Sequence, residues 1–150
     1  LKADIVDADA TQWRPENPVD AVLLDAPCTA TGTIRRHPDI PRRRRSADIT
    51  SATALQDRLL TAAVNMVAPG GTIIYSVCSL EPEEGTARVD ALLTSGAPVT
   101  LDPISAEDWP ELAGLTPSAI TPAGTLRTLP CHWSERGGMD GFFAARLIRN

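Results

Sequence analysis

Short apolar runs along the chain predict the strands of a sheet. Residues 19–25 form one such run, which ends at a polar residue two positions before Pro27, and residues 72–76 form a second. Neither run alternates between apolar and polar positions, which is the pattern of strands buried on both faces. Residues 141–148 predict the last strand, and residues 3–8 and 99–101 predict two shorter ones.

Two helices are predicted after the first two main strands. The first begins near Thr50 or Ser51, either of which can cap its first amides, and ends at residues 69–71 (Pro-Gly-Gly). Its apolar stripe has helical spacing and consists of Leu55, Leu59, Leu60, Ala63 and Val67. The second begins within residues 81–84, where acids complement the helix dipole, and ends at Gly96. This order predicts an α/β sheet whose active site lies beyond the carboxyl ends of its strands.

Composition then limits the class of protein. With 150 residues, 43% hydrophobic and 22% charged, the chain suits one globular domain, and six prolines between residues 97 and 130 predict mostly irregular structure there. No apolar run reaches the roughly 18 residues that a membrane span needs. The three cysteines are too few and too widely spaced for a disulfide scaffold or a paired-cysteine metal site. We therefore expect a cytoplasmic protein without a metal ion.

The charge is distributed unevenly. Residues 35–45 contain six arginines and one aspartate, which give a local charge of +5. Since the net charge of the chain is −5, the remaining residues together carry −10. This segment is either a solvated loop or a phosphate-binding loop, because guanidinium groups match phosphate oxygens in pairs. Three Trp, one Tyr and two Phe are too few for a broad platform that stacks single-stranded bases.

The candidate chemistry lies in two loops that contain cysteine. Residues 25–28 (Asp-Ala-Pro-Cys) follow the first main strand and residues 76–79 (Ser-Val-Cys-Ser) follow the second. If these strands are neighbours, both thiols lie at the same edge of the sheet. A single cysteine at a strand end is usually a small buried apolar residue, but two at equivalent ends favour chemistry. Metal binding, a redox pair, and a nucleophile with an assisting thiol remain open.

Five segments of the sequence resemble one known family. They are residues 25–32 (Asp-Ala-Pro-Cys-Thr-Ala-Thr-Gly), 75–79 (Tyr-Ser-Val-Cys-Ser), 82–84 (Pro-Glu-Glu), 34–40 (Ile-Arg-Arg-His-Pro-Asp-Ile) and 140–144 (Asp-Gly-Phe-Phe-Ala). The chain resembles the Sun/Fmu family of S-adenosylmethionine-dependent RNA cytosine-5 methyltransferases, and most of all its bacterial 16S rRNA methyltransferase B branch. The resemblance runs from about residue 3 to 149 and is weakest across residues 97–125. It implies a Rossmann-like class I methyltransferase sheet and an RNA substrate. The expected RNA in this branch is rRNA.

The resemblance also implies a role for each site residue. Cys78 would add to C6 of the cytosine, Cys28 would assist the elimination that frees the enzyme, and Asp25 would hydrogen-bond the base near N3. Cofactor contacts to S-adenosylmethionine would come from Asp9 or Asp7, with Asp25 and Pro27 beside it. The residues Arg35, Arg36 and His37 would contact RNA, and Arg42 to Arg45 would do so less directly.

The sequence departs from the family pattern in several places. Val77 stands where the family usually has Thr, and Gly85 stands where Asn is common. No glycine-rich cofactor loop follows a first strand, so we expect that loop and the first two strands to lie upstream of Leu1. The chain would then be the C-terminal portion of one catalytic domain, with an incomplete sheet and an open edge at residues 19–25. We expect such a fragment to bind S-adenosylmethionine weakly and not to turn over.

Two other functions stay open from the sequence. In a DNA cytosine-5 methyltransferase the thiol after proline, here Cys28, is the nucleophile. A non-catalytic RNA-binding remnant would need only the arginine-rich segment.

Overall fold

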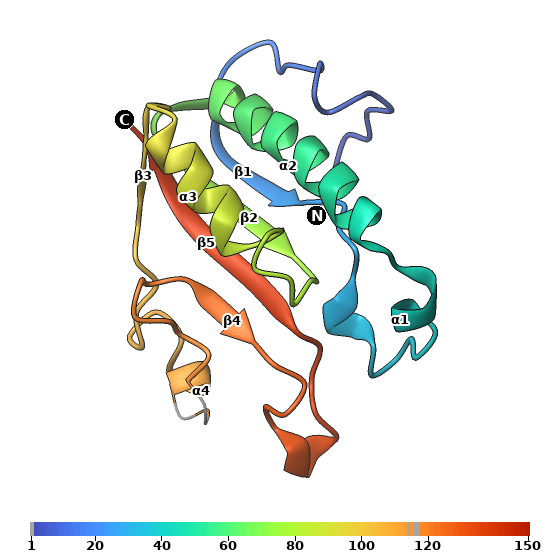
Figure 1. Cartoon of the computed structure of the whole chain (residues 1–150). Helices are drawn as coiled ribbons and strands as arrows, with labels where there is room; N and C mark the ends of the chain where they lie inside the picture. The colour runs from blue at the N-terminus through green and yellow to red at the C-terminus, as the bar shows by residue number, and fades with distance from the viewer. Residues whose placement is uncertain (1, 114, 116–117) are drawn as a thin grey trace.

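One mixed sheet runs through the protein. The computed structural model describes residues 2–113, 115 and 118–150 (Figure 1). The strand order is β1-β2-β5-β3, with β4 also paired to β5, and the strands are β1 (Val19–Asp25), β2 (Val67–Val77), β3 (Val99–Leu101), β4 (Leu126–Thr128) and β5 (Phe142–Arg149). β1 and β2 are parallel, whereas β5 is antiparallel to β2, β3 and β4. The predicted α/β class and the last strand are confirmed.

The two longer helices lie on the same face of this sheet. They are α2 (Ser46–Met66) and α3 (Thr86–Thr94), and Figure 1 shows both in front of the strands. Shorter helical turns are η1 (Thr31–Thr33), α1 (Ile40–Arg43), α4 (Pro110–Ala113) and η2 (Ser134–Arg136). No helix among the described residues is both long and apolar enough to cross a membrane.

The core fills the space between the sheet and these helices. Tyr75 and Phe143 are almost fully buried at its centre, with ring centroids 6.3 Å apart in an edge-to-face arrangement. The Tyr75 hydroxyl donates a 2.6 Å hydrogen bond to the main-chain carbonyl of Glu84. This bond ties β2 to the turn that precedes α3.

The structure places the starts of both helices differently from the prediction. α2 begins at Ser46, because the Asp48 carboxylate accepts a 2.8 Å hydrogen bond from the Arg45 amide and caps the helix there. The predicted caps, Thr50 and Ser51, lie within the helix. Likewise α3 begins at Thr86 and not within residues 81–84, because those residues form a turn that directs Glu84 inward.

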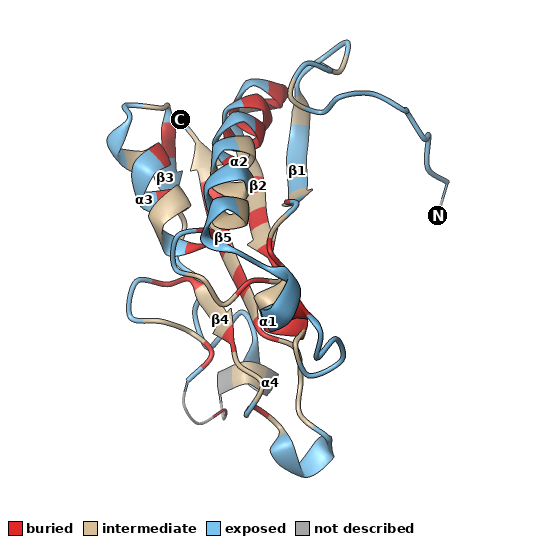
Figure 2. Cartoon of the chain, turned by 45° about the vertical axis from the view of Figure 1, so that its right-hand side comes forward, coloured by how far each residue is buried: buried red, intermediate tan, exposed pale blue. Residues whose placement is uncertain are grey.

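The strand predicted at residues 3–8 does not form. These residues are exposed and take no regular structure, and Figure 2 shows the N-terminal segment extending away from the rest of the protein. In contrast, β3 confirms the short strand predicted at residues 99–101, and residues 102–125 are mostly irregular as expected. Residues 114, 116 and 117 of that stretch lie outside the described residues.

β1 is half-buried, and the prediction that it is covered on both faces is wrong. Val22 and Leu24 pack against the core, whereas Leu23 points to the opposite face and is 73% exposed. Within the described residues β1 pairs only with β2, so the expected open edge is present. Among the described residues, β1 therefore has one uncovered face as well as one unpaired edge, although its apolar run suggested a central strand.

Candidate active site

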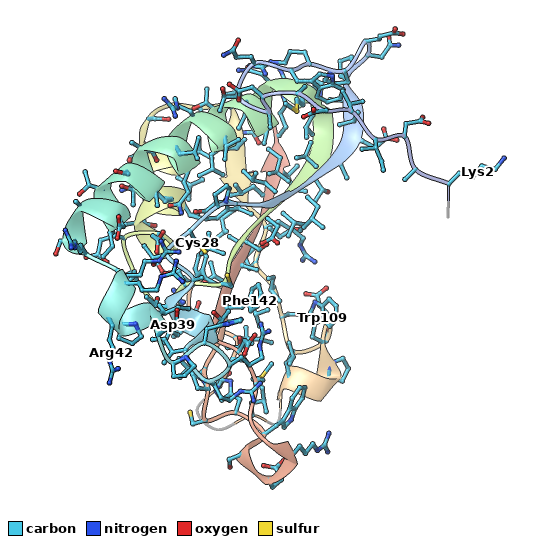
Figure 3. The ribbon with its side chains drawn as sticks, turned by 90° about the vertical axis from the view of Figure 1, so that its right-hand side faces the viewer. Lys2, Cys28, Asp39, Arg42, Trp109 and Phe142 are labelled. Atoms are coloured by element: carbon cyan, nitrogen blue, oxygen red, sulfur yellow. The ribbon has the colours of Figure 1, made fainter. Side chains whose placement is uncertain are left out.

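The two cysteine loops meet beyond the carboxyl ends of β1 and β2. The strands are parallel and in register, with Asp25 opposite Ser76, and the Ala26 amide donates a 2.9 Å hydrogen bond to the Ser76 carbonyl. Directly beyond this pair, the Sγ atoms of Cys28 and Cys78 lie 3.5 Å apart. In the view of Figure 3, Cys28 lies on the side of the protein that carries Asp39 and Arg42, away from Lys2. The expectation that both thiols lie at one edge of the sheet is confirmed.

The contact between the two sulfur atoms shifts their pKa values in opposite directions. The hydrogen bond from the Cys28 thiol lowers the pKa of Cys78 to about 7, although burial and the nearby Asp25 carboxylate oppose this effect. The same hydrogen bond, together with burial, raises the pKa of Cys28 far above its ordinary range. Cys78 is therefore the more acidic thiol of the pair, which gives the two cysteines distinct chemical characters.

This difference predicts a pH-dependent reactivity of Cys78. In a Cys131→Ser background, alkylation of Cys78 by iodoacetamide should rise with pH to a half-maximal rate near pH 7, because only the thiolate reacts. Mass spectrometry of the two cysteine peptides measures each rate. Cys28→Ala removes the hydrogen-bond donor and should shift the Cys78 midpoint upward. A midpoint that stays near pH 7 in this variant would show that Cys28 does not stabilise the thiolate.

A buried carboxylate behind the thiols joins the two loops, and the sequence interpretation missed it. Glu84 is fully buried and accepts hydrogen bonds from the Thr29 amide at 2.9 Å, the Gln56 side chain at 3.1 Å and the Ser79 hydroxyl at 2.6 Å. The Thr29 hydroxyl also donates to it. In the sequence, Glu84 looked like an acid in the first turn of a helix. Only the family-like run Pro-Glu-Glu marked its position.

A second set of contacts fastens the loops to the start of β5. The Gly32 amide donates to the Cys78 carbonyl at 3.0 Å, and the Gly141 amide donates to the Gly32 carbonyl at 2.8 Å. The Thr31 hydroxyl accepts a 2.9 Å hydrogen bond from the Leu80 amide. Three segments distant in sequence therefore approach each other at Gly32.

Gly32→Ala tests the need for this close approach. A Cβ at residue 32 would lie 1.9 Å from the Gly141 carbonyl oxygen and 2.9 Å from that of Cys78, so the main chain itself must move. We expect a loss of about 2 kcal/mol in the free energy of unfolding, measured by urea denaturation. Gly96→Ala is the control, because a Cβ there meets no atom within 4 Å and adds only the strain of its positive φ. Equal losses in the two variants would contradict the steric explanation.

Asp25 and Pro27 lie on the outer side of the thiol pair. Asp25 is exposed at the end of β1 and its carboxylate accepts a 3.2 Å hydrogen bond from the Ser76 hydroxyl. Pro27 is also exposed, and its carbonyl accepts a 2.9 Å hydrogen bond from the Gln56 side chain. The structure thus brings both residues to the cysteine edge of the sheet, as predicted.

Asp7 and Asp9 occupy the extended N-terminal segment. The Asp9 carboxylate accepts hydrogen bonds from the amide and hydroxyl of Thr11 at 2.9 and 2.8 Å, which lowers the pKa of Asp9. Asp9 therefore caps its own turn. Figure 2 shows that this segment runs away from the sheet, so the structure does not gather Asp7 and Asp9 with the cysteines.

The arginines near the site have separate contacts. Arg36 donates to the Asp140 carboxylate through Nε at 2.8 Å, Arg35 lies 3.5 Å from the same carboxylate, and these contacts lower the pKa of Asp140. Arg44 donates through Nε to the Thr29 carbonyl at 2.9 Å. His37 is exposed. The predicted RNA contacts Arg35 and Arg36 thus also hold the loop before β5 against the loop after Cys28.

A pocket of about 400 Å³ opens beside the cysteine loops. Thr29 and Leu80 contribute to one wall, and the other residues include Arg44, Arg45 and Ile49 from α2 and the segment before it. Its wall combines apolar carbon with guanidinium groups. Within the described residues, no group of three or more His, Cys, Asp or Glu side chains could hold a metal ion.

Comparison with solved structures supports a methyltransferase-like fold. The chain aligns with NSun6 from Pyrococcus horikoshii, solved with SFG, at a TM-score of 0.72 and 26% identity over 97% of this chain and 34% of that one. It aligns with a methyltransferase homologue from the same organism at a TM-score of 0.62 and 29% identity, covering 89% of this chain and 40% of that one.

Sequence comparison extends this result to named relatives. Ribosomal RNA small subunit methyltransferase B of Salmonella arizonae is 38% identical over 99% of this chain, and its counterpart in Xylella fastidiosa is 41% identical over the whole chain. The chain spans about a third of the length of these relatives, 31% and 32% respectively. The family model described as 16S rRNA methyltransferase RsmB/F matches residues 1–148. The chain therefore belongs to the 16S rRNA methyltransferase RsmB/F family.

Proposed function

We propose that this chain is the C-terminal part of a cytoplasmic enzyme that transfers a methyl group from S-adenosylmethionine to C5 of a cytosine in ribosomal RNA. The observation that carries the proposal is the 3.5 Å contact between the Cys28 and Cys78 sulfurs beyond β1 and β2. The rRNA substrate is the one named for the relatives in Salmonella arizonae and Xylella fastidiosa. The C5 position is what the resemblance to the Sun/Fmu family implies, and a pair of neighbouring thiols suits that reaction.

Cys78 acts as the nucleophile. Its thiolate adds to C6 of the cytosine, so that the C5=C6 double bond opens and C5 becomes electron-rich. The lowered pKa of Cys78 keeps a large share of this sulfur ionised near neutral pH. The raised pKa of Cys28 makes that thiol the weaker candidate for this step, which favours the RNA-type assignment over the DNA-type one.

Cys28 acts as the base that releases the product. Once the Cys78 sulfur is bonded to carbon, the hydrogen bond that raised the pKa of Cys28 is gone, and Cys28 can lose its proton to water. The Cys28 thiolate then takes the C5 proton, the C5–H electron pair restores the C5=C6 bond, and Cys78 leaves as a thiolate. This step regenerates the starting pair, with one thiol and one thiolate.

Asp25 orients the base. It is the exposed carboxylate nearest to the pair along β1, and its negative charge raises the pKa of Cys78 slightly against the effect of Cys28. A carboxyl group at this position can hydrogen-bond the N3 edge of the cytosine and stabilise the charge that develops on the ring.

The described residues fit one side of a cofactor site. S-adenosylmethionine supplies, when bound, a methyl group on a positively charged sulfur, and a neighbouring structure was solved with the analogue SFG. Asp25 and Pro27 would hold it at the end of β1, beside the exposed face that carries Leu23. Asp9 or Asp7 would contact its adenine only if the N-terminal segment packed against that face.

The RNA backbone has cationic partners around the cysteine edge. Arg35, Arg36 and His37 are exposed next to the loop that precedes β5, and Arg44 and Arg45 line the adjacent pocket. Guanidinium groups at such positions neutralise phosphates and fix the register of the strand. We propose that these residues bind the RNA backbone and position the target base at the thiol pair.

Tritium release tests the proposed reaction. The complete protein that contains this chain should release tritium to water from rRNA labelled at cytosine C5, in proportion to the methyl groups transferred. Methyl transfer without tritium release would place the methyl group at another atom and overturn the C5 assignment. The Cys78→Ala variant serves as the background control, because it lacks the proposed nucleophile.

A further inference from the structure

Glu84 is surrounded by hydrogen-bond donors alone. Its side chain is 0% exposed and receives the amide and hydroxyl of Thr29, the side-chain amide of Gln56 and the hydroxyl of Ser79. The two N–H groups can only donate, so a neutral acid or an amide would be satisfied only if at least one of the two hydroxyls reversed its hydrogen bond and accepted. The four contacts together fix the carboxyl group between the two loops.

The donors sit directly behind the two sulfur atoms. Thr29 directly follows Cys28 and Ser79 directly follows Cys78, so the residue next to each thiol is bound to the carboxylate. The Ser79 hydroxyl, which donates to Glu84, accepts from the Glu81 amide at 3.1 Å. The carboxylate is thus the shared anchor of both cysteine loops.

The side chain of Gln56 is held in an energetically unfavourable setting by its contact with Glu84. Its side-chain nitrogen donates to the Pro27 carbonyl at 2.9 Å and to Glu84 at 3.1 Å. Its own buried Oε1 atom meets no hydrogen-bond partner in the part of the chain that the structure describes. A reversed amide would turn that oxygen toward two acceptors, so the Cys28 loop and Glu84 together fix its orientation. A buried charge and an unpartnered amide oxygen are both unfavourable for folding, and both lie behind the thiols.

We propose that Glu84 is a positioning residue for the thiol pair, whose carboxylate holds the loops after β1 and β2 at the spacing that lets Cys28 donate to Cys78. The proposal deepens the proposed function and rests on it for the role of Cys78 as nucleophile. The negative charge of Glu84 also raises the pKa of Cys28 and so favours the protonated form of that thiol.

The other charged groups around the pair come from different segments. Asp25 from the end of β1 and Asp140 from the loop before β5 both oppose ionisation of Cys78. Arg36 from the loop after η1 also interacts with the Cys78 charge, while its guanidinium is bound to Asp140. Asp25 also links the two strand ends, through one 3.2 Å hydrogen bond from Ser76, but it is exposed. Glu84 differs because it is buried and binds the residue that follows each cysteine.

The pH dependence of Cys78 alkylation in the complete protein that contains this chain tests the proposal. In a Cys131→Ser background, Glu84→Gln should slow alkylation of Cys78 by iodoacetamide at pH 7 by about tenfold, because its thiolate is no longer stabilised by a well-placed Cys28. Thr29→Val removes one donor and keeps the shape of the side chain. It should shift the pH midpoint of Cys78 alkylation upward. Thr29→Ser should restore it.

Tyr75→Phe is the matched control. It removes a buried hydrogen bond to the main-chain carbonyl of Glu84 and leaves the four contacts of the carboxylate in place. It should lower the thermal unfolding temperature without moving the Cys78 midpoint. If Glu84→Gln lowers stability and leaves the midpoint near pH 7, Glu84 is a purely structural residue and the proposal is wrong.

The assay separates this proposal from the proposed function. If Glu84→Gln does not fold, the Thr29→Val midpoint decides: an upward shift supports positioning and an unchanged midpoint overturns it. Neither RNA nor S-adenosylmethionine is needed. An upward shift combined with a complete protein that fails to release tritium from rRNA would leave the positioning intact and reject the C5 reaction.

Discussion

Cys78→Ala is expected to abolish methyl transfer in the complete protein, with a loss of about a thousandfold or more, and Cys28→Ala is expected to arrest the enzyme on its RNA. The two outcomes differ because the two sulfurs have different roles. Without the Cys78 thiolate no bond to C6 forms. Without Cys28 the bond forms and the C5 proton has no base to accept it, so the covalent complex persists.

A denaturing gel distinguishes these two states. The complete protein is incubated with unmodified rRNA and S-adenosylmethionine, and complexes that survive denaturation are counted for each variant. We expect such a complex with Cys28→Ala and none with Cys78→Ala. The reverse pattern would assign the nucleophile to Cys28 and would make this a site of the DNA-methyltransferase type. Cys131→Ser is a suitable control, because this cysteine is exposed and lies outside the thiol pair.

The 150-residue chain alone is expected to bind S-adenosylmethionine with a dissociation constant weaker than about 1 mM. Small-molecule sites usually bury most of their ligand, whereas the candidate cofactor side here is an open strand edge with Leu23 73% exposed. Asp9, which would bind the adenine, instead caps its own turn in a segment directed away from the sheet.

Isothermal titration calorimetry of the isolated chain measures this affinity. The complete protein is the positive control, and it should bind at least about a hundredfold more tightly. Micromolar binding by the 150-residue chain would mean that the described residues form a whole cofactor site. The proposal that this chain is one part of a larger catalytic domain would then lose its main support.

The location of the thiol pair could be predicted because it depends on topology. Two apolar runs joined by a helix predict adjacent parallel strands, and such strands present their carboxyl ends at one edge of the sheet. Cys28 and Cys78 occupy equivalent positions after those runs, so their approach follows from strand order alone. Asp25 and Pro27 reach the site for the same reason.

The role of Glu84 could not be predicted from local patterns. An acid two residues after proline, followed by an apolar helix, is the usual composition of a helix start. Its burial depends on Thr29 and Gln56, which are 55 and 28 residues away and meet it only in the folded chain. Local spacing carries no information about such a network.

The errors at the N-terminal side have one physical origin. An apolar run shows that a strand has residues to bury, but it does not show that another element covers them. β1 therefore forms with Leu23 uncovered, and residues 3–8 remain without strand structure because no neighbour pairs with them among the described residues.

Peptide mapping of a trapped complex tests most directly whether Cys78 attacks the pyrimidine. The complete protein is reacted with S-adenosylmethionine and rRNA that contains 5-fluorocytosine, which cannot lose its C5 substituent as a proton. After digestion, mass spectrometry should find the nucleotide attached to the peptide that carries Cys78, with Cys28 unmodified. Attachment to Cys28, or the absence of any covalent nucleotide while methyl transfer continues, would contradict the account.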